Sequence, residues 1–395
     1  MKLSKPSQLV LVSTIGLLVA TLFTACQLVT VDYVFLAGSD GIQGFAVDSE
    51  SGALRPGPPT VSSGGNNPVA LAVTSDYANL YAANADNDTV VHFTLDSNGV
   101  LTKKDSITLP AAPVAIAVNQ ANTYLYVAYG STTASLAEYS LSSGAIGSSV
   151  ATESLTVPGF TTDTMIPTGV TVLANNAAVY VSAYDQSAYN PGGTVTSSAN
   201  PGWVFGFGVG GGGALTASSG SPYQTGVKPS GLTADPTSRF VYVTDYASNQ
   251  LVGYGVSSGS TLTFLLSGPF KTGSEPSAVS IDPRGKYVYV SNALDSSVSA
   301  YAIDLATGIP SSVVNVTGSQ INATDTQPVA IAIDPALGRF VYTANYLGDS
   351  ISGFQLNPNT GALKSSQATP YPAQSHPTAI AIVPHGNHSL ESTAP

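Results

Sequence analysis

Charged side chains are scarce in this chain: Asp, Glu, Lys and Arg make up 9% of its 395 residues, while hydrophobic residues make up 43%. Surface helices need charged residues on their exposed face, so the sequence leaves little room for long helices of that kind. Only 12 residues are Lys or Arg, and the formal net charge is −11. Because an acidic surface repels phosphate groups, we expect no nucleic acid among the partners.

Cysteine occurs once, as Cys26, and histidine four times. A single cysteine excludes an internal disulfide and a zinc site built from several thiolates. His385 and His388 have a spacing that suits metal ligands, but they lie in a polar C-terminal segment without further ligands nearby. We therefore expect no metal site and no other cofactor.

The N-terminal segment has the composition of an export signal. Lys2 and Lys5 precede an uncharged, mostly apolar run over residues 9–23. A helix rises about 1.5 Å per residue, so this run is too short to cross a hydrocarbon layer of about 30 Å. A cleaved signal peptide is therefore favoured over a transmembrane anchor.

The run ends in the sequence Leu-Phe-Thr-Ala-Cys, with Ala25 directly before Cys26. This ending resembles a bacterial lipoprotein signal, which implies that Cys26 is lipidated and becomes the first residue. Gln27 favours, by the same resemblance, the outer membrane of a two-membrane cell. The alternative is an ordinary secretory peptide with a nearby cysteine. We predict a signal peptide over 1–25, a tether over 26–31, and a location in the cell envelope, on the outer membrane or periplasmic side, or outside the cell.

Internal repeats point to the fold. A proline, a short apolar run, a turn, a second apolar run with a tyrosine and a polar loop recur along the chain, which is rich in glycine (39) and proline (26). The prolines are Pro68, Pro113, Pro167, Pro229, Pro276, Pro328 and Pro377. The tyrosines, thirteen or fourteen residues later, are Tyr81, Tyr126, Tyr180, Tyr242, Tyr289 and Tyr342. A turn glycine follows in each unit, at Gly52, Gly99, Gly144, Gly213, Gly259, Gly308 and Gly361.

The two ends of the chain complete one unit. Residues 32–37 form a tyrosine-type strand that no proline strand precedes, and residues 377–383 form a proline strand without a partner after it. Pairing of these two segments closes a ring of seven units. We predict an all-β, seven-bladed β-propeller over residues 32–383, with four-stranded antiparallel blades (strands A to D) and a disordered tail over 384–395. The repeat tyrosines are expected to pack blade against blade.

Residues 239–245 (RFVYVTD) and 286–292 (KYVYVSN) resemble the YVTN-type propeller repeat. The whole unit is similar to the seven-bladed β-propeller lactonase family, which includes bacterial 6-phosphogluconolactonase. The resemblance covers about residues 32–383. It implies the propeller architecture, and it leaves activity open because related propellers also serve as binding proteins.

A propeller brings its B–C and D–A connections to one face, around the mouth of the central channel. Loops on a rigid scaffold concentrate binding groups. The predicted ligand-binding residues are therefore those that end strand B or follow it, together with one that precedes strand A: Asp245, Asn292, Asn345, Tyr184, Tyr246, Tyr346 and Gln327. The alternative for Asn292 and Asn345 is a turn-forming role, since Asn often bonds its own backbone.

Three functions remain open at this point. The first is an exported monomer that binds a small hydroxyl-rich molecule or glycan at the mouth. The second, implied by the resemblance, is a lactone hydrolase with His376 or Glu275 as general base and Lys228 at the oxyanion. An exported enzyme of this type is expected to act on a substrate without phosphate. The third is a non-catalytic scaffold for envelope proteins. The insertion over 184–202 is either a recognition loop or a tolerated surface loop without a binding role.

Overall fold

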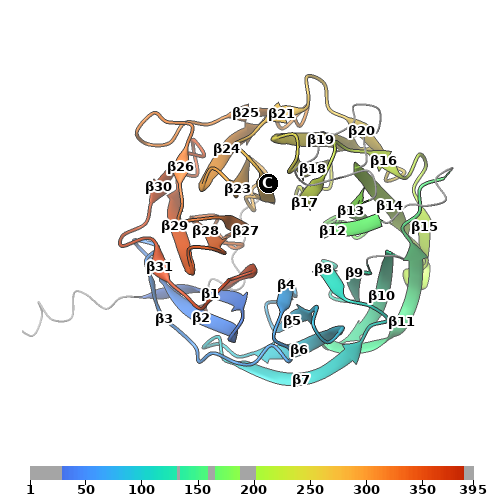
Figure 1. The fold of residues 1–395 in the computed structure, drawn as a ribbon, viewed down its shortest axis with the longest axis horizontal. Helices are drawn as coiled ribbons and strands as arrows, with labels where there is room; N and C mark the ends of the chain where they lie inside the picture. Colours follow the sequence, from blue (N-terminus) through green and yellow to red (C-terminus); the bar gives the residue numbers. More distant parts are fainter. Residues whose placement is uncertain (1–28, 131–133, 159–164, 187–201, 387–395) are drawn as a thin grey trace, which may run out of the picture.

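The computed structural model describes residues 29–130, 134–158, 165–186 and 202–386. Seven antiparallel sheets stand around one axis like the blades of a propeller (Figure 1). Each blade has four main strands that run outward from the axis in the order A, B, C, D. The predicted all-β, seven-bladed fold is confirmed.

Among the described residues, each of the first three blades contains four strands. Blade 1 has β32 (Ala379–Pro384), β1 (Thr30–Gly38), β2 (Gly41–Asp48) and β3 (Leu54–Pro56). Blade 2 has β4 (Pro68–Val73), β5 (Asn79–Asn84), β6 (Thr89–Leu95) and β7 (Leu101–Thr108). Blade 3 has β8 (Pro113–Val118), β9 (Tyr124–Tyr129), β10 (Ser135–Ser142) and β11 (Ala145–Ser154).

Blades 4 to 7 add a two-residue strand that pairs with strand C beyond the end of strand D. Blade 4 has β12 (Met165–Val172), β13 (Ala178–Asp185), β14 (Gly202–Val209), the 3-10 turn η1 (Gly211–Gly213), β15 (Leu215–Ala217) and β16 (Tyr223–Gln224). Blade 5 has β17 (Pro229–Ala234), β18 (Phe240–Asp245), β19 (Gln250–Val256), β20 (Leu262–Phe264) and β21 (Phe270–Lys271). Blade 6 has β22 (Pro276–Ile281), β23 (Tyr287–Asn292), β24 (Ser297–Ile303), β25 (Pro310–Ser312) and β26 (Asn322–Ala323). Blade 7 has β27 (Pro328–Ile333), β28 (Phe340–Asn345), β29 (Ser350–Leu356), β30 (Leu363–Ser365) and β31 (Tyr371–Pro372).

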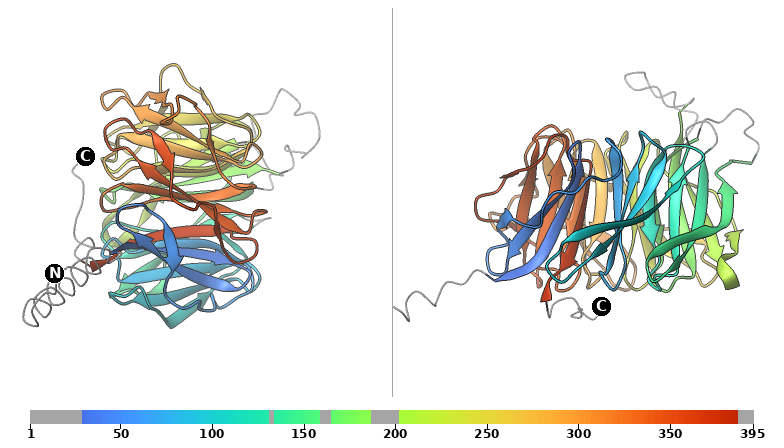
Figure 2. Two further views of the ribbon diagram at one scale, coloured as in Figure 1. Left: turned by 90° about the vertical axis from the view of Figure 1, so that its left-hand side faces the viewer. Right: turned by 90° about the horizontal axis from the view of Figure 1, so that it is seen from below.

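The ring closes where the sequence predicts. Strand β32 pairs antiparallel with β1, in register from Asp32 opposite Pro384 to Ala37 opposite Ala379. In Figure 1 the last strand, in red, lies beside the blue first strand. The boundaries differ slightly from the prediction, because β1 already begins at Thr30 and β32 runs to Pro384. The start of β1 and the end of β32 therefore share one face of the disc (Figure 2).

The tyrosine and the turn glycine that mark the repeat contact each other across neighbouring blades. The buried hydroxyl of Tyr289 in blade 6 donates to the carbonyl of Gly361 in blade 7, at 2.8 Å. The same bond joins Tyr81 to Gly144, Tyr242 to Gly308 and Tyr342 to Gly52, and Tyr180 uses the carbonyl of Ser260 instead of Gly259. These bonds confirm that the repeat tyrosines hold blade to blade.

The glycine is required at this turn for two reasons. Gly361 has φ +73°, which L side chains rarely adopt. A Cβ atom there would also lie 2.3 Å from a ring carbon of Tyr287 in the neighbouring blade. Glycine at this position avoids both the strained φ and the clash, while in blade 5 Ser260, with φ +59°, offers the turn carbonyl instead.

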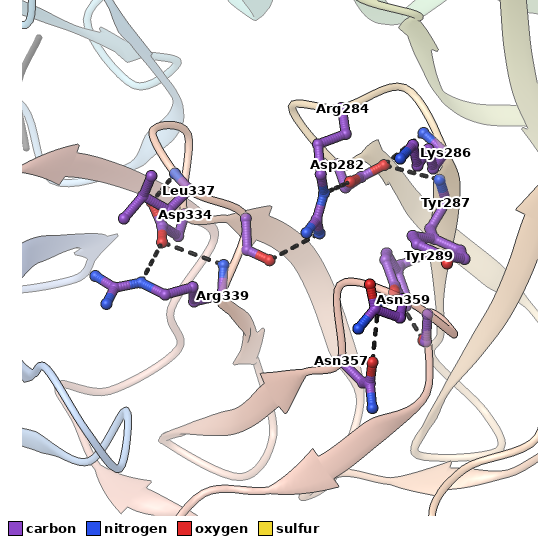
Figure 3. Close-up of polar contacts among 12 residues, drawn as sticks. Asp282, Arg284, Lys286, Tyr287, Tyr289, Asp334, Leu337, Arg339, Asn357 and Asn359 are labelled. Carbon is purple, nitrogen blue, oxygen red and sulfur yellow. Dashed lines mark hydrogen bonds and ion pairs between the residues drawn. The ribbon is translucent and has the colours of Figure 1, made fainter. Parts of the chain in front are cut away.

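The face opposite the predicted mouth is stabilised by aspartates in the A–B turns (Figure 3). Asp282 accepts hydrogen bonds from the backbone N–H groups of Lys286 and Tyr287 and forms a 2.6 Å ion pair with Arg284. Arg284 also donates to the carbonyl of Gly338, which links blade 6 to blade 7.

The sequence repeats predict that Arg239, Arg284 and Arg339 share one repeat position before strand B. The structure corrects this alignment. Arg284 stands two residues after its turn aspartate, while Arg239 and Arg339 directly precede β18 and β28. Lys286 is the residue that directly precedes β23.

The tyrosine bond gives a stability prediction. Tyr289→Phe leaves the buried Gly361 carbonyl without its donor, so we expect the free energy of unfolding to fall by about 1–2 kcal/mol. For a domain of this size that corresponds to a lower Tm by a few degrees, measured by differential scanning calorimetry.

Tyr126→Phe is the matched control, because the buried hydroxyl of Tyr126 has no hydrogen-bond partner among the residues that the structure describes. This variant should keep the wild-type Tm within about one degree. Equal losses in the two variants would contradict the proposed role of the bond.

Candidate functional site at the propeller mouth

The two sets of residues that the sequence predicts at the mouth lie side by side. The residue after strand B donates its backbone N–H to the carbonyl of the residue before strand A of the same blade. Tyr246 bonds Lys228 at 2.9 Å, and Tyr346 bonds Gln327 at 2.8 Å. Both sets therefore lie at the face opposite the chain ends, where the B–C and D–A connections meet.

The side chains make contacts within blade 5 and also reach the two neighbouring blades. The Lys228 ammonium, before β17, lies 4.4 Å from the ring centroid of Tyr246 and 5.6 Å from that of Tyr184 at the end of β13. The Tyr246 hydroxyl donates to Glu275 Oε2 at 2.6 Å, and Glu275 leads into β22. These four residues, here called the Lys–Glu cluster (Tyr184, Lys228, Tyr246 and Glu275), join blades 4, 5 and 6.

In the Lys–Glu cluster the Lys228 ammonium and the Glu275 carboxylate both contact the side chain of Tyr246. Burial lowers the pKa of Lys228, and the nearby Glu275 carboxylate partly opposes that shift. The faces of the two tyrosine rings attract the ammonium by cation–π interaction. The cluster therefore holds a half-buried cation beside an acceptor that Tyr246 orients.

The loops that carry these side chains are fixed by hydrogen bonds from the preceding B–C turn. Glu275 has φ +53°, and its N–H donates to Asn249 Oδ1 at 2.8 Å. His376 has φ +51°, and its N–H donates to Asp349 Oδ1 at 2.7 Å. Non-glycine residues rarely adopt this conformation, and such residues cluster at functional sites. The sequence analysis missed Asn249 and Asp349, although both follow the end of strand B by four residues.

Three of the predicted ligand-binding side chains are fully buried. Asp245 accepts from the backbone N–H groups of Val227 and Lys228, at 2.9 Å each, and so fixes the loop that carries the lysine. Asn292 and Asn345 donate to serines of their own strand C. Direct ligand contact by these three residues stays a prediction, and their present bonds are within the blade.

The remaining nominated residues lie elsewhere on the ring. His376 packs edge-on against Tyr346, with ring centroids 4.8 Å apart, where blade 7 meets blade 1. Gln327 precedes β27, between the Lys–Glu cluster and His376. Of the three residues nominated for catalysis, the structure thus joins Lys228 and Glu275 through Tyr246 and places His376 in a separate contact.

Hydroxyl groups below the mouth join the inner strands of neighbouring blades at three places. Ser230 donates to the carbonyl of Pro276, and Ser277 donates to that of Pro328, each in the next blade. The Thr378 hydroxyl, just before β32 in blade 1, donates in the same way to the carbonyl of Pro68 in blade 2. The sequence analysis did not use this signal, a hydroxyl directly after the repeat proline.

Other predicted features lie outside the described residues. These are Cys26, the signal segment, most of the 184–202 insertion and the end of the tail. Within the described part of the chain, no three His, Cys, Asp or Glu residues gather as metal ligands would. The same part contains no helix that is long and apolar enough to cross a membrane.

Solved structures with this fold include a periplasmic gluconolactonase from Pseudomonas aeruginosa, with 20% identity and a TM-score of 0.70 over 90% of this chain and 99% of that one. A putative 6-phosphogluconolactonase from Bacteroides fragilis has 18% identity and a TM-score of 0.70, over 89% and 98%. A protein from Lactobacillus plantarum has 17% identity and a TM-score of 0.71, over 90% and 100%. These similarities show the fold.

A comparison with curated proteins returned no match. The sequence model of one family, described as lactonase, 7-bladed beta-propeller, matches residues 24–165 and 213–390. This match covers most of the chain and agrees with the resemblance seen in the repeats. The chain therefore belongs to the lactonase family of seven-bladed β-propellers.

Proposed function

We propose that this protein hydrolyses a small hydroxyl-rich lactone at the Lys–Glu cluster. The observation that carries the proposal is the position of Tyr246, whose ring faces Lys228 and whose hydroxyl bonds Glu275. Lactone opening needs a general base and a group that stabilises the developing oxyanion. Glu275 and Lys228 supply these two functions within one contact network. Family membership and the named gluconolactonase among the similar structures support the reaction class.

In this mechanism Glu275 accepts a proton from a water molecule as the water oxygen attacks the lactone carbonyl carbon. The carbonyl electron pair moves to oxygen, and the Lys228 ammonium stabilises that oxyanion. When the tetrahedral intermediate collapses, the ring C–O bond breaks and Glu275 returns the proton to the leaving alkoxide. The product is a hydroxy acid. Tyr246 holds one oxygen of the Glu275 carboxylate, which leaves the other to act as base.

The substrate is expected to carry no phosphate. The Lys228 charge is already shared between two tyrosine rings and the Glu275 carboxylate, so the cluster holds little surplus positive charge for a dianion. The rings of Tyr184 and Tyr246 instead suit the apolar face of a sugar-like ring.

A second candidate is a binding protein without turnover. Tyrosines follow strand B in more than one blade, and this favours the second candidate. Tyr346 and His376 form a second aromatic contact at the mouth, apart from the Lys–Glu cluster. A glycan that spans both contacts would fit this arrangement better than a small lactone.

We also propose that the protein is exported and anchored by a lipid on Cys26. Val29, three residues later, leads into β1 at the face opposite the mouth. A lipid on Cys26 would hold that face toward the membrane, so the mouth would point away from it. The name of the similar periplasmic gluconolactonase supports export.

Substitutions in the Lys–Glu cluster test the enzyme proposal. Glu275→Gln removes the base and Lys228→Met removes the cation, so we expect each to lower kcat by about 100-fold or more. The assay is hydrolysis of D-glucono-δ-lactone and related lactones, with wild-type and variant folds compared by circular dichroism.

Asn67→Ala is the matched control, because Asn67 stands directly before strand A in blade 2 as Glu275 does in blade 6. It should retain wild-type turnover. Activity that survives both cluster variants but disappears in His376→Ala would contradict the assignment and move the base to His376. Binding of a glycan without turnover by the wild type would favour the second candidate.

The alkaline limb of the pH profile should depend on Lys228. Burial lowers its pKa from the usual value of about 10.4, so the charged form is lost as pH rises, earlier than for an exposed lysine. Enzymatic turnover should therefore decline on the alkaline side. Lys228→Arg keeps its charge because arginine does not titrate there, and should shift the decline to higher pH. Rates are corrected for spontaneous lactone hydrolysis, and an unchanged limb in Lys228→Arg would exclude this role.

The anchor is tested by fractionation of cells that express the full chain. Wild-type protein should sediment with membranes and incorporate labelled palmitate, since two or more acyl chains give stable attachment. Cys26→Ser should appear in the soluble fraction without label. Equal distribution of both proteins would show that Cys26 carries no anchor.

A further inference from the structure

The junction between blades 3 and 4 has both residues of the repeat bond but not the bond itself. Tyr126 is the repeat tyrosine of blade 3, and its buried hydroxyl has no hydrogen-bond partner among the described residues. Gly213 is the turn glycine of blade 4, with φ +84°, as in the bonded junctions. Some other feature of this junction therefore prevents the usual contact.

The side chain of Glu138 lies at the place of the missing bond. Glu138 on β10 pairs directly with Tyr126 on β9. Its Oε1 lies so close to the turn that a Cβ atom at Gly213 would clash with it. The Glu138 side chain is fully buried. A carboxyl group thus packs against the turn of the next blade, where other junctions place a tyrosine hydroxyl.

Most other blades have a small residue opposite the repeat tyrosine, namely Gly206, Gly253, Ala300 and Gly353. Blade 2 has His92 there, and its ring nitrogens bond Asp105 Oδ2 and Asn79 Oδ1 at 2.9 Å each. Tyr81 in that blade keeps its bond to Gly144. An ionisable side chain at this position is therefore compatible with the tyrosine bond when its own blade supplies partners.

Glu138 has no such partners. Neither carboxylate oxygen accepts a hydrogen bond from any residue that the structure describes. The ionisable groups nearest to it in its own blade are the phenols of Tyr124 and Tyr126 on β9 and the carboxyl of Glu153 on β11. In blade 4, β14, η1 and β15 carry no charged residue, and β13 carries only Asp185, at its mouth end.

Positive charge is absent from the sequence of both blades. Residues 105–227, which include all of blades 3 and 4, contain no Lys, Arg or His. Burial raises the pKa of Glu138 to about 7. An ionised Glu138 would therefore be a buried charge without a counter-ion or a hydrogen-bond donor, which is costly in a protein interior.

We propose that the junction between blades 3 and 4 is a pH-sensitive joint, closed while Glu138 is protonated and loosened when its carboxyl ionises. The folded protein holds this proton more tightly than the unfolded chain, in which glutamate has a pKa of about 4.3. The stabilisation is thus complete below about pH 4 and is lost as the pH rises to about 7. The joint does not require the lactone hydrolysis proposed above.

The test is hydrogen–deuterium exchange of the full chain at pH 5 and pH 8, read by mass spectrometry and corrected for the intrinsic pH dependence of exchange. In the wild type, protection of β10 and β14 should fall at least tenfold between these pH values. Strands β24 and β29, at the junction of blades 6 and 7 that the Tyr289 bond holds, are the internal reference and should change less than threefold.

Glu138→Gln keeps the size of the side chain without the ionisation and should abolish the fall in protection. Glu138→Ala, with the residue type that blade 6 has at this position, is a second variant with the same expected result. Glu153→Gln is the matched control, because it removes a partly exposed carboxyl from the same face of blade 3 and should keep the wild-type response.

Asp32, which is also fully buried without a partner in the described structure, is present in every variant, so its titration cancels in the comparison. An equal fall in wild type, Glu138→Gln and Glu138→Ala would overturn the proposal. Unchanged protection of β10 and β14 in the wild type, or an equal fall at both junctions, would overturn it as well. Because the readout involves no substrate, these outcomes are independent of the proposed enzyme.

Discussion

The hydrogen bond from a buried tyrosine to a turn carbonyl of the next blade fixes five of the seven blade junctions. It joins strand B of one blade to the C–D turn of its neighbour, for example Tyr242 to Gly308 and Tyr342 to Gly52. The second of these bonds crosses from blade 7 to blade 1, where β32 and β1 also pair. Because each bond is buried and directional, it limits how one blade can rotate against the next. The angle between neighbouring blades in turn determines where the mouth residues lie.

The candidate site depends on this angle because its contacts cross blade boundaries. Tyr246 belongs to blade 5, while its hydroxyl partner, Glu275, leads into blade 6. Lys228 leads into blade 5, yet it also faces Tyr184 of blade 4. A small rotation between blades would separate the phenol from the carboxylate. The inner hydroxyl bonds, such as Ser230 to Pro276, add a second constraint directly below the cluster.

Neighbouring blades have equivalent backbone positions that carry different side chains. Blade 6 has Gly273 with Asp295, and blade 7 has Asp325 with Gly348, so the carboxylate comes from opposite sides of the same space. A Cβ at Gly273 would lie 2.8 Å from Asp295 Oδ2, and one at Gly348 would lie 2.8 Å from Asp325 Cγ. Each blade therefore accommodates one acid at this place.

The sequence alone determined the four main strands of each blade, the number of blades and the closure, because proline, tyrosine and glycine each have a local backbone or packing requirement that recurs in most units. Five inner strands begin at the repeat proline, and β5, β18, β23 and β28 end at the predicted residues. The extra strands β16, β21, β26 and β31 were missed, since two residues of pairing leave no periodic pattern.

Only the tertiary structure decided which mouth residues meet. A repeat pattern assigns Lys228, Glu275 and His376 to equivalent positions, but it does not give the angle between blades that brings Lys228 and Glu275 to one tyrosine and leaves His376 on another. It also does not distinguish a side chain that enters the blade from one that faces the mouth, so Asp245 and Tyr246 look equally available in sequence. Contacts between side chains distant in sequence depend on packing, and packing is not encoded in any single repeat.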